Sequence, residues 1–252
     1  MAGGLLGVRA VLFDVNGTLV EIHTEEGMEQ IFRAAGHFLT YQGVDLRRGE
    51  VRDRYFELLK EQQRTSSEKY PEFDSVAIWR TILDENATAY TRALPPEKYA
   101  QLPLFLAEMS RGISRRRLRL YPHVREVLNV LRTHLPLAVV TDAQAANAMG
   151  ELHQVELLDY FDPIVVSGDY GFRKPDPRLF RYALNALGVA AEDAVHVGND
   201  MYRDIFGAQA VGLQTIMFNS DQGAKEYPDT APDHTISDHR ELLDLLGLPR
   251  PG

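Results

Sequence analysis

The chain has 252 residues, of which 44% are hydrophobic and 25% are charged, as in an ordinary globular protein with one large or two modest domains. Its formal net charge of -9 argues against non-specific nucleic-acid binding, since no excess of basic residues exists to neutralise phosphates. The absence of cysteine excludes disulfides, thiol catalysis and cysteine-bound zinc. No apolar run approaches the roughly 20 residues that span a bilayer, and residues 1–7 are too short and uncharged for a secretory signal. We therefore expect a cytoplasmic protein with no membrane partner.

The first predicted element is a strand at Val11–Phe13, which ends at Asp14. A short apolar run closed by turn residues is typical of a buried strand in a parallel sheet. Gly17 and Thr18 then turn the chain away, which leaves Asp14 at the carboxyl end of the strand. Open α/β sheets bind their ligands outside those ends, so Asp14 is a candidate functional residue. A carboxylate that only caps the turn is the alternative.

The segment from residue 21 to residue 118 differs in character, because it contains helix-compatible stretches and no clear buried strand. Proline residues interrupt these stretches at Pro71 and at Pro95–Pro96. The run Arg115–Arg119 is interpreted as a solvated junction between domains. The predicted helical stretches are Glu25–Ala35, Arg52–Arg64 and Val76–Tyr90.

Beyond residue 118 strands alternate with helices, which predicts a mostly parallel sheet covered by helices on both faces. Asp176 and Pro177 are typical of a helix start, with the aspartate as N-cap and the proline at the first helical position. His196 lies inside an apolar strand and is interpreted as a core histidine. The predicted strands are Leu137–Val140, Ile164–Ser167, Ala194–Val197 and Leu213–Phe218, and the predicted helices are Val124–Leu131, Phe180–Leu187 and Leu242–Leu246.

Polar residues follow three of these strands, as Asp14 follows the first one. They are Thr141 with Asp142, then Lys174, then the cluster of Asn199, Asp200 and Asp204. The order carboxylate, hydroxyl, lysine and acidic cluster resembles the four motifs of the haloacid dehalogenase-like (HAD) hydrolase superfamily. The segment Leu120–Leu128 also looks like the place where the chain of that family re-enters its core. Four motifs in the right order over nearly the whole chain are far more specific than one alone.

The resemblance implies an α/β fold with a Rossmann-like three-layer core, a mostly parallel sheet and a helical cap domain. The core would comprise residues 1–20 and 119–252, and the cap would comprise residues 21–118. A cap makes physical sense because a reactive site at the edge of a sheet stays open to water until another segment closes over it.

The resemblance also implies a Mg²⁺-dependent phosphohydrolase that acts on a small phosphorylated metabolite. Asp14 would attack phosphorus and form an aspartyl-phosphate. Thr141, together with Asp142, would bind the substrate's phosphoryl group, and Lys174 would neutralise the nucleophile and the transferring group.

The magnesium ligands that the family implies are the carboxylates of Asp14 and Asp200 and the main-chain carbonyl of Asn16. Such a set of oxygen ligands suits Mg²⁺. Asp204 would orient the cluster by hydrogen bonding to the ligands. Asn199 lies beside Asp200 and could also supply a ligand, and the sequence does not show which of these two residues dominates metal binding. It also leaves the oligomeric state undetermined.

Asn16 departs from the family pattern, because phosphatases of this family usually carry a second aspartate there. That aspartate protonates the leaving group and then activates the hydrolytic water, and asparagine cannot exchange a proton in this way. The backbone carbonyl remains available to a metal. The substitution therefore removes an acid–base contribution of roughly 10²–10⁴-fold in rate.

This departure leaves several alternatives open. A 2-haloacid dehalogenase expels halide without protonating it, but dehalogenases of this family typically have an aromatic residue at the position of Asn16 and use no metal. Phosphonoacetaldehyde hydrolase-like chemistry needs a Schiff-base lysine from the cap, and Lys60, Lys69 and Lys98 stand in no recognisable motif. A catalytically weakened phosphate-binding module and an engineered Asn16 are the remaining alternatives.

Overall fold

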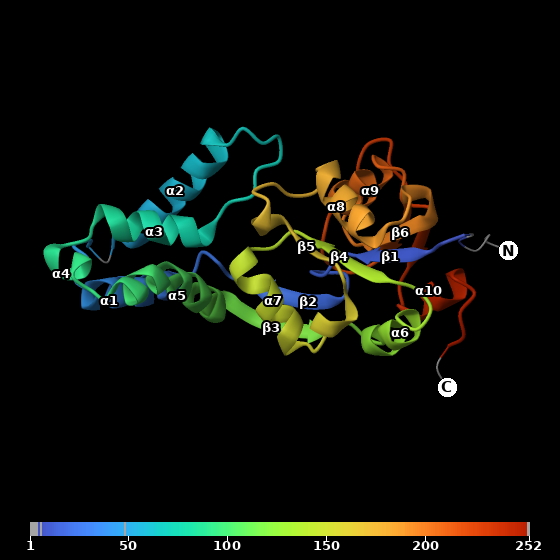
Figure 1. Ribbon diagram of the computed structural model, residues 1–252, viewed down its shortest axis with the longest axis horizontal. Coiled ribbons are helices and arrows are strands. Elements are labelled where there is room, and N and C mark those ends of the chain that lie inside the picture. The colour runs from blue at the N-terminus through green and yellow to red at the C-terminus, as the bar shows by residue number, and fades with distance from the viewer. Residues whose placement is uncertain (1–4, 6, 48, 251–252) are drawn as a thin grey trace. The chain divides into compact units, whose positions relative to one another are not determined.

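The computed structural model describes residues 5, 7–47 and 49–250, and the chain divides into two compact units. One unit comprises Met1–Ile22 and Leu118–Gly252, and the other comprises His23–Arg117. Both boundaries lie within two paired strands, β2 (Val20–Thr24) and β3 (Arg115–Leu120). The chain therefore leaves the first unit and returns to it through one two-stranded sheet, whose strands are labelled in Figure 1.

The first unit is an α/β unit built on a six-stranded sheet of order β5-β4-β1-β6-β7-β8, and every neighbouring pair of strands is parallel. Its strands are β1 (Ala10–Phe13), β4 (Leu137–Thr141), β5 (Ile164–Val166), β6 (Ala194–Gly198), β7 (Gln214–Phe218) and β8 (His234–Ile236). Its helices are α6 (Val124–Leu131), α7 (Ala145–Gln154), α8 (Pro177–Leu187), α9 (Gly207–Gln209) and α10 (Arg240–Leu245), with the 3₁₀ turns η1 (Leu158–Tyr160), η2 (Ser167–Asp169) and η3 (Ala191–Asp193) and the π-helix η4 (Met201–Phe206).

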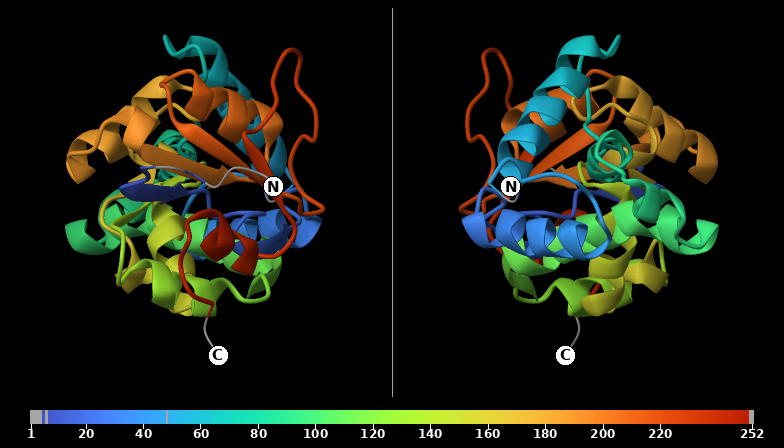
Figure 2. Two further views of the ribbon diagram at one scale, coloured as in Figure 1. Left: turned by 90° about the vertical axis from the view of Figure 1, so that its right-hand side faces the viewer. Right: turned by 90° about the vertical axis from the view of Figure 1, so that its left-hand side faces the viewer.

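The central strands bury side chains on both faces of the sheet, because successive residues of a strand point to opposite sides. On one face Val11 and Phe13 of β1 pack in a cluster with residues of α6 and α10. On the other face Ala10 and Leu12 pack with residues of α8 and α9. Figures 1 and 2 show these two pairs of helices on opposite faces of the sheet. The three-layer α/β fold expected from the sequence is thereby confirmed.

The second unit, between the two linking strands, has helices joined by loops as its regular elements in residues 25–47 and 49–114. It contains α1 (Glu29–Tyr41), α2 (Val51–Thr65), α3 (Ser75–Glu85), α4 (Ala89–Arg92) and α5 (Pro96–Ser114). Its own apolar core is centred on Trp79, Ile82 and Leu106, which are fully buried. Among the residues that the structure describes, no helix of either unit is long and apolar enough to cross a membrane.

Pro71 and Pro95 lie between helices, as the sequence analysis predicts. Pro96 itself opens α5, because the first turn of a helix needs no backbone N–H donor. The stretch predicted as one helix over 76–90 is two helices, since α3 ends at Glu85 and Thr88 caps the start of α4.

The structure also contains strands that the sequence analysis missed. The Arg115–Arg119 run, interpreted as a solvated junction, forms most of β3, with Arg116 and Arg117 exposed. Its partner β2 buries only Val20 fully. A ribbon that buries so little apolar surface leaves no clear hydrophobic pattern in the sequence, and β8 is only three residues long.

Candidate active site

Asp14 directly follows β1 and is 5% exposed. Its backbone N–H donates to the carbonyl of Val197 in the neighbouring strand β6 at 2.9 Å, which extends the sheet by one residue. The Thr18 hydroxyl donates to Oδ2 of Asp14 at 2.9 Å. The turn between them requires Gly17, whose φ is +84°, because a Cβ there would lie 2.2 Å from Nδ2 of Asn199. The turn therefore folds back so that Thr18 fixes the carboxylate of Asp14.

Lys174 brings a buried positive charge to this carboxylate from the loop that precedes α8. Its Nζ donates to Oδ1 of Asp14 at 2.7 Å, to Oδ1 of Asp204 at 2.6 Å and to the carbonyl of Val140 at 3.1 Å. All three ammonium protons therefore have an acceptor. The backbone N–H of Lys174 donates to Oδ1 of Asp142 at 2.9 Å, which ties the loop to the end of β4.

Asp204 of the π-helix η4 is the centre of the acidic cluster. Its Oδ2 accepts from the backbone N–H groups of Asn199 and Asp200, each at 3.0 Å. Nε2 of His196 lies 3.3 Å from Oδ1 of the same carboxylate, so the histidine predicted as a core residue is buried in β6 and also contacts the site. Gly198 makes room for Asp204, because a Cβ at that position would lie 2.3 Å from the aspartate's Cβ.

Asp200 turns its carboxylate toward its own helix. Oδ1 accepts from the backbone N–H groups of Tyr202 at 3.0 Å and Arg203 at 2.8 Å. Oδ2 accepts from the Arg203 guanidinium at 2.9 Å and from the backbone N–H of Ala224 at 3.0 Å. Four donors occupy the roughly four lone-pair positions of an ionised carboxylate. Asp200 therefore acts as a helix cap and an ion-pair partner.

Asn199, unlike Asp200, faces the turn between Asp14 and Thr18. The residue is 4% exposed, and its Oδ1 lies 3.3 Å from the Thr18 hydroxyl. Its Nδ2 donates to Oγ of Ser220 at 3.4 Å, which orients the amide oxygen toward the turn. The amide oxygen of Asn199 and the carboxylate of Asp14 thus meet the same hydroxyl group.

Burial and mutual charge perturb the titrating groups. Burial raises the pKa of Asp14, an effect that Lys174 partly offsets, and burial raises the pKa of Asp142 to about 6. Burial also opposes the charge of Asp204, but Lys174 and His196 outweigh it and hold that pKa below its ordinary value. Burial lowers the pKa of Lys174, and the attraction of the three carboxylates outweighs this and raises it. One buried ammonium thus faces three carboxylates, which leaves an excess of negative charge.

Two buried polar atoms at the end of β4 lack a hydrogen-bond partner among the described residues. They are Oγ1 of Thr141 and Oδ2 of Asp142. β4 pairs directly with β1, so both atoms belong to the strand end beside Asp14. Both atoms are therefore available to accept or donate a hydrogen bond at this strand end.

The structure brings some of the predicted site residues into contact and leaves others apart. Asp14, Lys174 and Asp204 are in direct contact, Asn199 joins them through Thr18, and Asp200 faces Arg203. Asn16 is half-buried in the turn. Within residues 5, 7–47 and 49–250, no group of three or more His, Cys, Asp or Glu side chains is arranged to hold a metal ion.

Sequence reasoning did not propose a role in the site for Thr18 or Arg203. The signal for Thr18 was its position four residues after Asp14 across a glycine turn, a spacing at which its hydroxyl can return to the carboxylate. Arg203 gave no such signal, because an arginine in a helix is most often a solvated residue.

The α/β unit thus carries a buried carboxylate–lysine pair, Asp14 with Lys174, at the carboxyl ends of its parallel strands. A family model described as haloacid dehalogenase-like hydrolase matches residues 8–212. The chain therefore belongs to the haloacid dehalogenase-like hydrolase family.

Similar proteins carry both phosphatase and dehalogenase names. The glyceraldehyde 3-phosphate phosphatase of Pyrococcus furiosus is 32% identical over 136 residues, which are 50% of this chain and 56% of that protein. The chain thus spans about half the length of this relative. The protein of the same name from Methanopyrus kandleri is 27% identical over 95% of this chain and 97% of its own. The crystal structure of a 2-haloacid dehalogenase from Pseudomonas syringae matches with a TM-score of 0.69 and 25% identity, over 95% of this chain and 98% of that one.

Proposed function

We propose that this hydrolase is a phosphohydrolase that acts on a small phosphorylated metabolite. The observation that carries the proposal is the contact of Asp14 with Lys174 and Thr18 beside the unpaired hydroxyl of Thr141. A nucleophilic carboxylate, a fixed positive charge and a free hydroxyl are what phosphoryl transfer to an aspartate needs. Similar proteins that are named phosphatases support the same proposal.

In this mechanism an oxygen of Asp14 attacks phosphorus, and the bond between phosphorus and the leaving oxygen breaks. Lys174 neutralises charge on the nucleophile and the phosphoryl group, and Thr141 donates a hydrogen bond to a phosphoryl oxygen. Water then attacks the aspartyl-phosphate, which releases inorganic phosphate and restores Asp14. Asn16 transfers no proton in either step, so the leaving group departs as an anion and takes its proton from water. We assign the role of cap to the helical unit.

Oxygen atoms of this site fit a hard cation such as Mg²⁺. The carboxylate of Asp14, the amide oxygen of Asn199 and the backbone carbonyl of Asn16 would hold the ion, and magnesium prefers few carboxylates with substrate and water oxygens. The negative excess of three carboxylates around Lys174 is a second point of fit. Bound Mg²⁺ would supply positive charge to the phosphoryl oxygens.

The division of metal binding between Asn199 and Asp200 is part of this proposal. Asn199 is the better candidate, because the oxygens of Asp200 already accept four hydrogen bonds. Asp204 holds the backbone amides of both residues and so orients the segment.

Haloacid dehalogenation is the second candidate. It is favoured by the dehalogenase among the similar structures and by Asn16, since a halide needs no proton to leave. The absence of an aromatic residue at position 16 counts against it.

The two candidates are separated by measuring phosphate release from acetyl phosphate and para-nitrophenyl phosphate and halide release from 2-haloacids, with and without Mg²⁺. We expect Mg²⁺-dependent phosphate release by the wild type and none by Asp14→Asn. Halide release without metal would establish the dehalogenase instead. Equal phosphate release by both proteins would show that Asp14 is not the nucleophile.

The metal assignment is tested by thermal unfolding with and without Mg²⁺ for Asn199→Ala and its matched control Asp200→Asn. Because a ligand that binds only the native state raises stability, Mg²⁺ should raise the unfolding temperature of the wild type and of Asp200→Asn. Asn199→Ala should lose this shift. The reverse pattern would return the ligand role to Asp200.

A further inference from the structure

His239 lies near the C-terminal end of the chain and contacts the turn between Asp14 and Thr18. Its Nε2 lies 3.0 Å from the carbonyl oxygen of Thr18, across 221 residues of sequence. A carbonyl oxygen only accepts hydrogen bonds, so Nε2 donates to Thr18 in the tautomer that carries the proton on Nε2, and the backbone of Pro122 also contacts the ring. Thr18 is therefore held twice, through its carbonyl by His239 and through its hydroxyl on Asp14.

The ring of His239 is a rigid support for this bond. The residue is 1% exposed, and its ring centroid lies 4.2 Å from that of Phe218 and 6.4 Å from that of Tyr121. Neither neighbour competes for Nε2. A buried, packed ring loses little further freedom when it forms its hydrogen bond, so it fixes the carbonyl of Thr18 in place.

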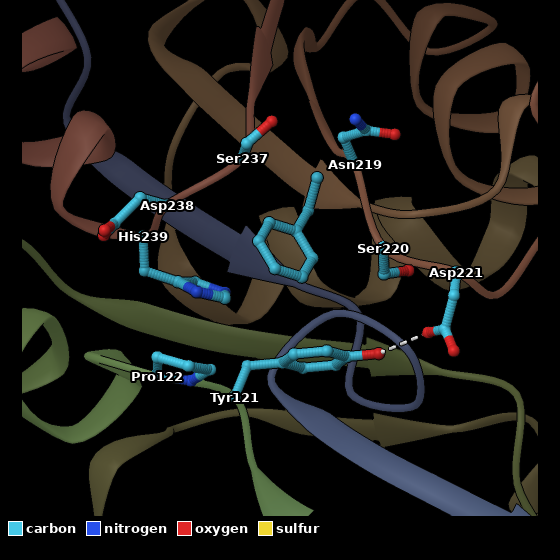
Figure 3. Close-up of a pocket in the computed structure, with 9 residues that line it drawn as sticks. Tyr121, Pro122, Asn219, Ser220, Asp221, Ser237, Asp238 and His239 are labelled. Carbon is cyan, nitrogen blue, oxygen red and sulfur yellow. Dashed lines mark hydrogen bonds between the residues drawn. The ribbon is translucent and has the colours of Figure 1, made fainter.

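A pocket of about 340 Å³ borders His239 within the α/β unit. Figure 3 shows the rings of Tyr121 and His239 among the residues that line this pocket, together with Ser220, Asp221 and Ser237. Since the pocket adjoins the imidazole, a small ring compound in solution has space to approach the position that His239 occupies.

We infer that His239 is a positioning residue for the nucleophile. By holding the Thr18 carbonyl it keeps the Thr18 hydroxyl between Oδ2 of Asp14 and Oδ1 of Asn199, and so orients the attacking carboxylate. The inference rests on the proposed role of Asp14 as nucleophile. It assigns His239 no contact with substrate, because the bond it makes is to the backbone of the turn.

Loss of this support changes the rate of attack more than substrate binding. Thr141 and Lys174, which the mechanism uses to bind the phosphoryl group, make no contact with His239 that the structure shows. A misplacement of about 1 Å in a reacting group costs up to about 10²-fold in rate. We therefore expect kcat to fall about 10–100-fold in a variant without the donor, while KM stays close to its wild-type value.

The test compares His239→Leu, which lacks a donor, with His239→Gln, which retains an N–H donor on a planar head group. Both are assayed with para-nitrophenyl phosphate at saturating Mg²⁺, and thermal unfolding checks that each is folded. We expect His239→Gln to retain most of the wild-type kcat and His239→Leu to lose it. Equal loss in both would show that the ring acts only as packing, and the inference would fail.

Chemical rescue supplies a second measurement that does not depend on the stability of His239→Leu. In His239→Gly, imidazole added to the assay should restore kcat, because it can enter through the pocket and donate to the Thr18 carbonyl. The matched control is 1-methylimidazole, which has the same ring and, at a pH where both compounds are neutral, no N–H donor. Equal rescue by both compounds, or by neither, would overturn the inference. If Asp14→Asn were as active as wild type, the proposed function would fail instead.

Discussion

The two units of the molecule use ion pairs of similar length in different surroundings. In the α/β unit Lys174 pairs with Asp14 at 2.7 Å and with Asp204 at 2.6 Å, and the three side chains are 2–6% exposed. In the helical unit Arg54 pairs with Glu57 at 2.8 Å and with Glu85 at 2.5 Å, and these side chains are 26–67% exposed. Distance does not distinguish the two sets, whereas burial does.

The difference in burial indicates which charged side chains are candidates for a functional site. Exposed pairs gain little, because water screens them and their side chains lose freedom on pairing. Buried pairs carry a large desolvation cost and are weak evidence for stability, but perturbed pKa values of the kind seen at Asp14 and Asp142 cluster at functional sites. We therefore expect substitution of the cation to have a large effect in the α/β unit and a small one in the helical unit.

The largest effect is expected for Lys174→Met. The change leaves Asp14 and Asp204 buried without their cation, which should abolish phosphate release and lower the free energy of unfolding by about 3–5 kcal/mol. Denaturant unfolding and the phosphatase assay measure the two losses. Adding Asp204→Asn should recover part of the stability without the activity. A stable and active Lys174→Met would remove the functional distinction between the two units.

The next largest effect concerns Asn16 and sharpens the role of the buried site. Asn16→Asp should restore a large part of the roughly 10²–10⁴-fold acid–base contribution, and the gain should be greatest for alkyl phosphates with basic leaving groups. Turnover of both proteins over a series of leaving groups at saturating Mg²⁺ measures it. If the two proteins had equal rates and the same dependence of rate on leaving-group basicity, position 16 would not face the leaving group. Peptide mass spectrometry is the control, because Asn16–Gly17 is prone to deamidation.

The α/β unit was more predictable from sequence than the helical unit, for a physical reason. Buried parallel strands appear in the sequence as short apolar runs, and the residues that end or follow these runs lie at one edge of the sheet. Asp14 and Thr141 could therefore be placed at neighbouring strand ends. The start of helix α5 could not be predicted in this way, because Pro95–Pro96 is as typical of a helix break as of a helix start.

Orientation within the site was less predictable than position. An aspartate after a strand is equally suited to bind a metal or to cap a helix, and only the structure shows Asp200 bonded to the backbone of η4 and to Arg203. His239 lies too far along the chain from Thr18 for any local pattern to connect them. Contacts of this kind follow from the folded topology alone.

A smaller effect is expected on stability at acid pH, through His239. Burial lowers the pKa of His239 to about 4, below the ordinary value of 6.5. The unfolded chain therefore binds a proton first as pH falls, so stability is lost between these two values and is present in full above the higher one. We expect the unfolding temperature of wild type to fall between about pH 7 and about pH 5 more steeply than that of His239→Gln. Parallel curves would show that His239 titrates normally.

The smallest effect is expected for Arg54→Met, the counterpart in the helical unit of Lys174→Met. Its partners Glu57 and Glu85 remain in contact with water after the change, so no charge is left buried. The free energy of unfolding should change by less than about 1 kcal/mol, and added salt should shrink even that difference because it screens exposed charges. Denaturant unfolding of the two methionine variants side by side, at low and high salt, makes the comparison. If Arg54→Met destabilised the protein as much as Lys174→Met, burial would not be what separates the two sets of ion pairs.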